Sequence, residues 1–512
     1  MQENVYKDPF AAECNQYARK FDDAFNAKDW VTTEHLIAES EELLKLHPND
    51  YAYAPLYYSL GTSYGDLAQH LDGCSTIDIQ EKELHYYRVC IELLSNRKLM
   101  NPEYKPYVTG LKLPLYTNYA NVLSNCGRKI YAIQYYRKVL EIKPDFHMAR
   151  GNIGVALLYY STLAHDAGHQ DYLNYFAYQN LKSALSDDAK DVHPEAREYF
   201  EQVINRFNTN YVSEFLEKPL QIRDYSLGDK QEKRYRMWCL QNHFFLNPLN
   251  DLPLLHSCFA TDSLQLPAIT TTIDEKDIPI FFGLFNQIKQ DFIYARFLFY
   301  QGQVDRSTPH YADKETGLTN LFDYPQYSIR IENEKTAFRL LYSLFDKVAF
   351  FANKYWKLGI KDTDVTFHSV WREESGHRPR YKHRALDTKS NIALLAMNWI
   401  YKDFNECFGD SPNPELKKFN VLRNALEHKY VKVHSDILYD NSEPYIDQEG
   451  TYHISEGDLY RFTHELMCMI RELIIELSMA VHISESGLFD CDESPKFVPN
   501  ITLGRYEDEW KI

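Results

Sequence analysis

A 34-residue unit in the first third of the chain constrains the fold more than any other feature. Residues 113–146 read LPLYTNYANVLSNCGRKIYAIQYYRKVLEIKPDF. Two stripes at helical spacing flank one glycine, and a proline closes the unit; the positions are Tyr116, Tyr119, Ala120, Leu123, Gly127, Ala132, Tyr136, Val139 and Pro144. Small residues in both stripes let two helices approach closely, while the aromatic residues fill the space beside them. The unit therefore predicts two amphipathic helices joined by a tight turn.

Similar stretches recur on both sides of this unit. The first-helix positions are filled in YYSLGTSYGDLAQ by Tyr57, Leu60, Gly61 and Tyr64, and in ARGNIGVALLYY by Ile153, Gly154 and Leu157. A weaker match spans residues 17–48. The pattern resembles the tetratricopeptide (TPR) repeat, and we expect four imperfect repeats forming an α-solenoid over residues 10–212. Such a surface normally binds a peptide or protein segment, although a purely structural or dimerising solenoid is the alternative.

Composition and charge narrow the classes of function. The 512 residues carry a net charge of −17, which argues against a general nucleic-acid coat but allows a local basic site. We find no secretory leader and no apolar stretch of membrane-spanning length. Nine cysteines without a C-x-x-C pair fit a reducing compartment. We therefore expect a cytoplasmic protein with no membrane segment, no metal and no cofactor.

The second half of the chain has a different organisation. Residues 213–272 are rich in Pro, Asn and Asp yet carry the apolar clusters MWCL and HFFL, so we expect an ordered connector packed on the C-terminal domain. Five later segments have apolar residues at helical spacing: 278–302, 334–359, 391–408, 413–434 and 455–483. Strand-like alternation is scarce, which predicts a helical bundle over residues 273–485 and a tail over 486–512. The predicted fold class is all-α.

A basic loop interrupts this bundle. Residues 371–390 contain six basic and three acidic residues, a local charge of +3, with Trp371 and Tyr381 interleaved. Phosphate contacts and stacking on aromatic faces would suit RNA, whereas a solvated loop is the alternative. The candidate RNA-binding residues are Arg372, Arg378, Arg380, Lys382 and Arg384, with Lys429 and Lys432 from the helical segment 413–434.

An arginine followed by a histidine after four to six residues is a second candidate feature. The chain has four such pairs: Arg236 and His243, Arg372 and His377, Arg378 and His383, and Arg423 and His428. Because this pattern is loose, structural context must separate the pairs. Only the last pair, in LRNALEH, lies on a predicted helix with a strong apolar stripe.

A helical wheel places the polar residues of that segment. Leu422, Leu426, Tyr430 and Val433 share a narrow face, and His428 lies opposite with Asn424. We therefore expect His428 to be exposed. Arg423 lies at the edge of the apolar face.

The RNALEH segment on the penultimate helix of a small bundle resembles the HEPN family of nucleases. The family motif has Arg, a polar residue, three further residues and His, which Arg423, Asn424 and His428 fill. The resemblance covers residues 275–485, and the connector sequence YRMWCLQNHFFLNPLNDL resembles a bacterial HEPN subgroup fused to TPR-like repeats. The resemblance implies a metal-independent RNA endonuclease that works as a dimer, often as a toxin or antiviral effector.

These residue types suit metal-independent RNA cleavage. A histidine can take or give a proton near neutral pH, and an arginine can stabilise charge on the phosphate. Arg423 and His428 are about 140° apart around a regular helix, so one copy cannot easily present both to one phosphate. Two copies related by a twofold axis can bring the arginine of one copy and the histidine of the other to the same phosphate. The alternatives are a non-catalytic adaptor whose repeats bind a protein, and a catalytically silent bundle that binds RNA.

Overall fold

The computed structural model describes most of the chain. The described residues are 8–70, 76–210, 213–270, 278–304, 308–373, 380–381, 386–404, 413–437, 439, 443–490, 503–504 and 506–511. Helices dominate this part of the chain, with only short strands among them. The all-α prediction is confirmed.

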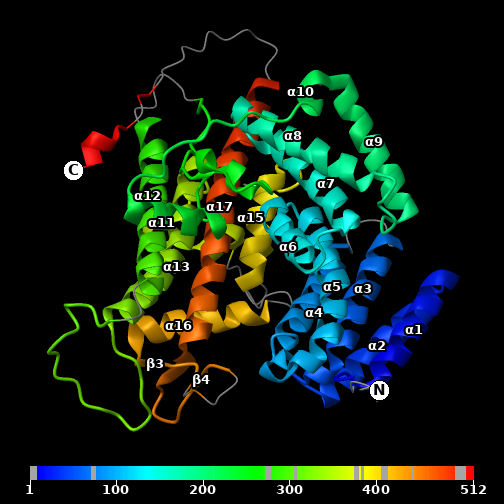
Figure 1. Cartoon of the computed structure of the whole chain (residues 1–512), viewed down its shortest axis with the longest axis horizontal. Helices are drawn as coiled ribbons and strands as arrows, with labels where there is room; N and C mark the ends of the chain where they lie inside the picture. Colours follow the sequence, from blue (N-terminus) through cyan, green and yellow to red (C-terminus); the bar gives the residue numbers. More distant parts are fainter. Residues whose placement is uncertain are drawn as a thin grey trace.

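The N-terminal half consists of helices packed in sequence order. Their bounds are α1 Ala12–Ala27, α2 Trp30–Leu46, α3 Ala54–His70, α4 Thr76–Leu93, α5 Lys105–Asn125, α6 Lys129–Ile142, α7 His147–Leu163, α8 Ala167–Ala184, α9 Pro194–Asn210 and α10 Ser213–Glu217. Helices α1/α2, α3/α4, α5/α6 and α7/α8 each pack as a pair, and neighbouring pairs stack into a solenoid (Figure 1). Four helix pairs therefore occupy the region where four repeats were expected.

Helices α5 and α6 show why the clearest repeat unit folds as predicted. The side chains of Tyr119, Ala120, Ala132 and Tyr136 are all buried between the two helices and their neighbours. Gly127 forms the turn with φ of +85°, a backbone conformation that residues with a Cβ rarely adopt. A Cβ at Gly127 would also lie 2.8 Å from the carbonyl oxygen of Ile392 in the second half of the chain. The glycine thus permits both the turn and its close contact with the bundle.

The second half begins with the connector and continues as a bundle around one long helix. The helices are α11 Lys230–Gln241, α12 Ile278–Gln303, α13 Ile329–Tyr355, α14 Phe367–Trp371, α15 Ile392–Phe404, α16 Pro414–His428 and α17 Glu456–Asp490. Helix α17 runs through the middle of the molecule, with α12 and α13 on one side and the repeats on the other (Figure 1). The five predicted helical segments correspond to α12, α13, α15, α16 and α17.

The fourth predicted helix is shorter than expected. It ends at His428, and residues Val431–His434 form strand β3. This strand pairs in parallel with β5, Tyr452–Ser455, and β5 pairs antiparallel with β4, Tyr445–Ile446. The alternation V-K-V places Val431 and Val433 in the core, as a strand requires. Tyr430 is 45% exposed, so its predicted place on the buried face is wrong.

A buried ionic cluster joins the repeats to the bundle. Arg128, directly after the turn glycine, places Nη1 2.6 Å from Asp403 Oδ2 of α15 and Nη2 2.6 Å from Glu472 Oε2 of α17. Arg88 of α4 binds the other oxygen of Asp403 at 2.6 Å. All four side chains are buried, so their charges interact without screening by bulk water. Two arginines and two carboxylates thus fix the orientation of α4 and α6 relative to α15 and α17.

Glu476 lies one helical turn after Glu472 in α17. Its surroundings predict that the free energy of unfolding depends on pH. Its Oε2 is buried and has no hydrogen-bond partner among the described residues. Burial raises the pKa of Glu476 well above the ordinary value of 4.5, and the charge of Glu472 adds to this shift. The folded protein therefore holds this proton more tightly than the unfolded chain. The resulting contribution to stability is complete below the unfolded pKa and is lost as pH rises toward the folded pKa.

We expect Glu476→Gln to gain stability relative to the wild type as pH rises. The amide stays neutral, whereas the wild-type carboxyl loses about 1.4 kcal/mol per pH unit between its unfolded and folded pKa values. Denaturant unfolding of both proteins at about pH 5 and about pH 8 measures the difference. Parallel stability curves for the two proteins would contradict a raised pKa at this position.

Candidate functional site

Arg423 is held in place by its neighbours on α16 and α13. The side chain is half-buried, and its guanidinium carbon lies 5.8 Å from the centre of the Tyr342 ring. Its Nη1 donates a hydrogen bond of 3.0 Å to Asn424 Oδ1. Burial raises the pKa of Tyr342 to about 12, so the phenol remains neutral and donates to Asn420. The motif arginine is therefore oriented, and Asn424 supports it rather than the histidine.

His428 lies at the last residue of α16 and is exposed, as the helical wheel predicted. Asn424, Glu427 and Lys429 are exposed beside it, while Leu422 and Ala425 are buried and anchor the helix. The helix thus presents a polar, solvent-accessible face on a rigid base. An imidazole in this position can exchange protons with a ligand, provided that a second protein surface encloses the ligand on its other side.

The residues after the helix form a continuation of this surface. Lys432 Nζ lies 2.6 Å from Asp323 Oδ2, and this hydrogen bond raises the pKa of the lysine. The ammonium group also lies 5.6 Å from the Tyr430 ring. Tyr430 and Tyr327 are both exposed, and their hydroxyl groups are hydrogen-bonded. Of the two lysines predicted to bind RNA here, Lys429 is exposed and Lys432 is already paired with a carboxylate.

Only part of the basic loop lies within the described residues. Arg372 belongs to strand β1, Arg372–Glu373, which pairs antiparallel with β2, Arg380–Tyr381. Arg378, Lys382 and Arg384 lie outside the described residues. Trp371 is buried against Tyr401, with ring centres 6.2 Å apart, so the expectation that it stacks on RNA is wrong. Its position at the end of α14 places it in the core.

The pair Arg236 and His243 is structural. Arg236 Nη1 donates to the carbonyl oxygen of Ala260, and His243 hydrogen-bonds the carbonyl oxygen of Asn250. Burial lowers the pKa of His243 to about 2, which keeps the imidazole neutral. This pair stabilises the connector. The two pairs in the basic loop end at His377 and His383, which lie outside the described residues.

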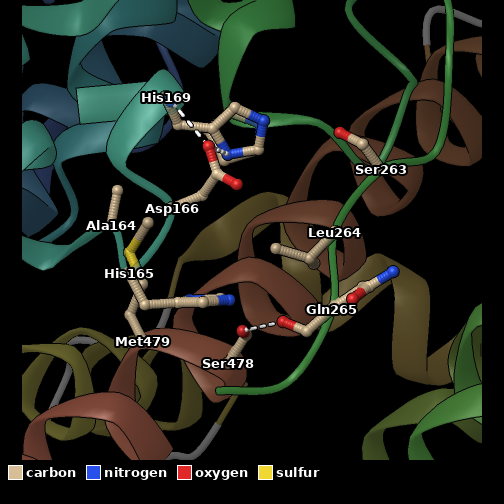
Figure 2. A pocket seen from close by; sticks show the side chains of 10 residues that line it. Ala164, His165, Asp166, His169, Ser263, Leu264, Gln265, Ser478 and Met479 are labelled. Atoms are coloured by element: carbon tan, nitrogen blue, oxygen red, sulfur yellow. Dashed lines mark hydrogen bonds and ion pairs between the residues drawn. The ribbon is translucent and has the colours of Figure 1, made fainter. Parts of the chain in front are cut away.

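A pocket lies where the repeats, the connector and α17 meet. Its volume is about 170 Å³, and its lining consists of Ala164, His165, Asp166, His169, Pro248, Ser263, Leu264, Gln265, Ser478 and Met479. Figure 2 shows Ser478 donating to the carbonyl oxygen of Gln265 and His169 facing Asp166. Burial lowers the pKa of both His165 and His169. None of the residues that the sequence predicted for catalysis or RNA binding lines this pocket.

Comparisons with known families match one segment in each half of the chain. Residues 113–146 match the tetratricopeptide repeat, and residues 272–484 match the LA2681-like HEPN family. Residues 272–484 form an LA2681-like HEPN domain. The resemblance drawn from RNALEH and from the repeat unit is confirmed. No curated protein and no solved structure matches the chain.

Within this HEPN domain the RNALEH segment lies on α16, at the end of the bundle next to the small sheet. Helix α16 packs against α13 and α15, and the sheet of β3, β5 and β4 lies beyond its end (Figure 1). Helix α16 also packs against α4 of the repeats, where Lys418 Nζ lies 2.6 Å from Glu92 Oε1, so the helix that carries Arg423 and His428 touches the repeats directly. Among the described residues, no helix is both long and apolar enough to cross a membrane.

Proposed function

We propose that this protein is a metal-independent RNA endonuclease of the HEPN type. The observation that supports the proposal is the RNALEH motif on α16 of the HEPN domain, with Arg423 oriented by Tyr342 and Asn424 and with His428 exposed. Side chains that are oriented yet reachable from solvent suit a macromolecular substrate. Repeats that bind a protein partner would direct or restrain the enzyme, in antiviral defence or as a toxin.

In the proposed reaction the 2′-hydroxyl of one nucleotide attacks the adjacent phosphorus while the bond to the 5′-oxygen breaks. His428 takes the proton from the 2′-hydroxyl or gives one to the leaving 5′-oxygen. Arg423 stabilises the negative charge that develops on the phosphate oxygens, since a guanidinium stays charged and offers several donors. Asn424 positions the arginine. The products are a 2′,3′-cyclic phosphate and a 5′-hydroxyl.

The complete site is proposed to form between two copies of the HEPN domain. In one copy the arginine is half-buried against α13, whereas the histidine is exposed at the end of α16. A second copy related by a twofold axis can bring its arginine to the histidine of the first. The exposed lysine Lys429, and the basic residues Arg372 and Arg380 of the loop, are proposed to contribute phosphate contacts.

Mixing two inactive variants tests this arrangement. We expect Arg423→Ala and His428→Ala to be inactive alone, and an equal mixture to recover about a quarter of wild-type activity after subunit exchange. Half of the dimers are then mixed, and each mixed dimer has one site with both residues intact. RNA cleavage in EDTA and analysis of the product ends measure the result.

Three outcomes would contradict the proposal. They are absence of recovery in mixtures shown to contain mixed dimers, full activity of a form that stays monomeric, and Mg²⁺-dependent cleavage that leaves 3′-hydroxyl ends. The double variant Arg423→Ala/His428→Ala, mixed with wild-type protein, is the matched control. Its mixed dimers contain one wild-type chain and one chain that lacks both Arg423 and His428, so neither composite site is complete.

A further inference from the structure

Two buried histidines face each other on neighbouring strands of the small sheet in the HEPN domain. His434 ends β3 and His453 lies in β5, and the two side chains are 5% and 6% exposed. His434 Nε2 lies 2.9 Å from His453 Nδ1, and the two ring planes are nearly parallel, with an angle of 5° between them. Tyr439 stacks on His434 and Tyr445 on His453, so both imidazoles have fixed orientations.

In each ring, the nitrogen that points away from the other histidine faces a hydrogen-bond acceptor. We call this the outer nitrogen. His434 Nδ1 lies 3.2 Å from the carbonyl oxygen of Asp323, which can only accept a hydrogen bond. His453 Nε2 lies 3.0 Å from Asp447 Oδ2. The other carboxylate oxygen of Asp447 accepts from the backbone N–H of Thr451 at 2.7 Å, which favours the ionised form. Each outer nitrogen is therefore the protonated one.

The contact between the two inner nitrogens, His434 Nε2 and His453 Nδ1, then has no hydrogen-bond donor. A neutral imidazole has one N–H, and the outer contacts use the N–H of both rings. His434 Nε2 and His453 Nδ1 then present two lone pairs to each other inside a buried site. A cation must lie between them, either a third proton or a metal ion. The Asp447 carboxylate, 3.0 Å from His453 Nε2, would offset the charge of an imidazolium there, so a third proton is the alternative that the test must exclude. A metal ion is a normal partner for two neutral imidazoles.

We propose that His434, His453 and Asp323 bind one divalent transition-metal ion, for which Zn²⁺ is the natural probe. One ligand atom from each of the three residues lies within 4.8 Å of the others. Zn–N bonds of about 2.0–2.1 Å in tetrahedral geometry hold two nitrogens about 3.3 Å apart. From their present separation of 2.9 Å, the two nitrogens would have to move apart and the rings to tilt until both lone pairs point at the ion. A water molecule would occupy the fourth position.

The surrounding groups match those of a metal site. Asp447 on His453 and the Asp323 carbonyl on His434 are the kind of hydrogen-bond partners that fix the tautomer of a metal-binding histidine. The carboxylates of Asp323 and Asp447 supply two negative charges, and Lys432, which lies 2.6 Å from Asp323 Oδ2, supplies one positive charge beside the ion. Asp323 has a side chain that is 39% exposed, which gives the ion a route from solvent.

The proposed ion would fasten a long loop to the sheet. Residues 308–328 leave the body between α12 and α13 and return beside β3 (Figure 1). Asp323 lies on this loop, and the backbone N–H of Gln326 donates to the carbonyl oxygen of Val433 at 2.7 Å. The loop carries exposed apolar residues, including Phe322, which is 99% exposed. The role of the ion is therefore structural and separate from the cleavage chemistry proposed for His428.

Metal titration of the untagged full-length protein tests this site. After EDTA treatment and desalting, we expect calorimetry to show one Zn²⁺ per chain, and Co²⁺ to produce visible absorption bands of a four-coordinate site. His434→Gln and Asp323→Asn should each weaken Zn²⁺ binding by about tenfold or more. The control His428→Ala removes an exposed histidine nearby and should bind Zn²⁺ like the wild type.

The design separates the possible outcomes. Asp323→Asn changes a partly exposed loop residue, so it reports on binding even if His434→Gln fails to fold. Protease cleavage within residues 308–328 should slow when Zn²⁺ is added to the wild type and should be insensitive to Zn²⁺ in Asp323→Asn. Absence of saturable binding, or equal binding by the wild type and Asp323→Asn, would overturn the proposal and leave a shared proton between the rings. The titration contains no RNA, so its failure is independent of the proposed nuclease function.

Discussion

Replacing His428 with alanine is expected to lower RNA cleavage by about 100- to 10,000-fold, the usual contribution of a general acid or base. The fold should remain intact because the side chain is exposed at the end of α16. Cleavage of total and defined RNA, with analysis of the product ends, measures the rate. Circular dichroism and thermal unfolding check the fold. Expression of the variant in cells should also relieve any toxicity of the wild type.

A matched substitution separates loss of chemistry from loss of a surface histidine. His35 on α2 is another exposed histidine, with a side chain that is 74% exposed, and it lies in the repeats. His35→Ala should cleave RNA at the wild-type rate. If His428→Ala is equally active, the nuclease proposal fails, and an adaptor whose repeats bind a protein partner becomes the better explanation.

Arg128→Ala is expected to lower the free energy of unfolding by about 3–5 kcal/mol. The substitution removes the guanidinium that binds both Asp403 and Glu472. Asp403 keeps its contact with Arg88, whereas the buried Glu472 loses its counter-charge. The loss of one partner costs more than the intact cluster contributes, because an unpaired buried charge cannot be solvated. Denaturant unfolding at neutral pH measures the change.

An exposed ion pair provides the control for this substitution. Lys182 and Glu217 are about half exposed, so Lys182→Ala should cost less than about 1 kcal/mol. Similar losses in the two variants would show that the buried cluster is not a major source of stability. A large loss in Arg128→Ala alone would show that the buried cluster stabilises the contact between the repeats and the HEPN domain. Any ligand of the repeats would then act on a bundle to which they are firmly docked.

The regular elements were predictable because their signals are local. The stripe through Tyr119, Ala120 and Leu123 identifies a helix within a few turns, and Gly127 marks its end. The exposure of His428 followed from the same periodicity, since Leu422 and Ala425 bury the opposite face. RNALEH was found through its resemblance to a family, because the bare spacing of Arg and His occurs four times in the chain.

The errors arose where distant partners decide the structure. Strand β3 directly follows a helix, and its four residues become a strand because β5 pairs with them from eighteen or more residues away. Trp371 lies beside basic residues in the sequence, yet it packs against Tyr401 of α15. The facing histidines were also missed. A V-K-V-H alternation ahead of Y-H-I-S was the available signal, but it does not reveal that the two strands pair.

The sequence by itself determined the helical class, the repeat unit and the residues RNALEH, because hydrophobic periodicity and turn chemistry act over a few residues. Only the tertiary structure decided how these parts cooperate. It placed Arg128 between Asp403 and Glu472, oriented Arg423 on Tyr342, and brought His434 against His453. Each of these contacts joins residues that are distant in the chain. Their charges and lone pairs acquire a defined partner only when packing removes water from between them.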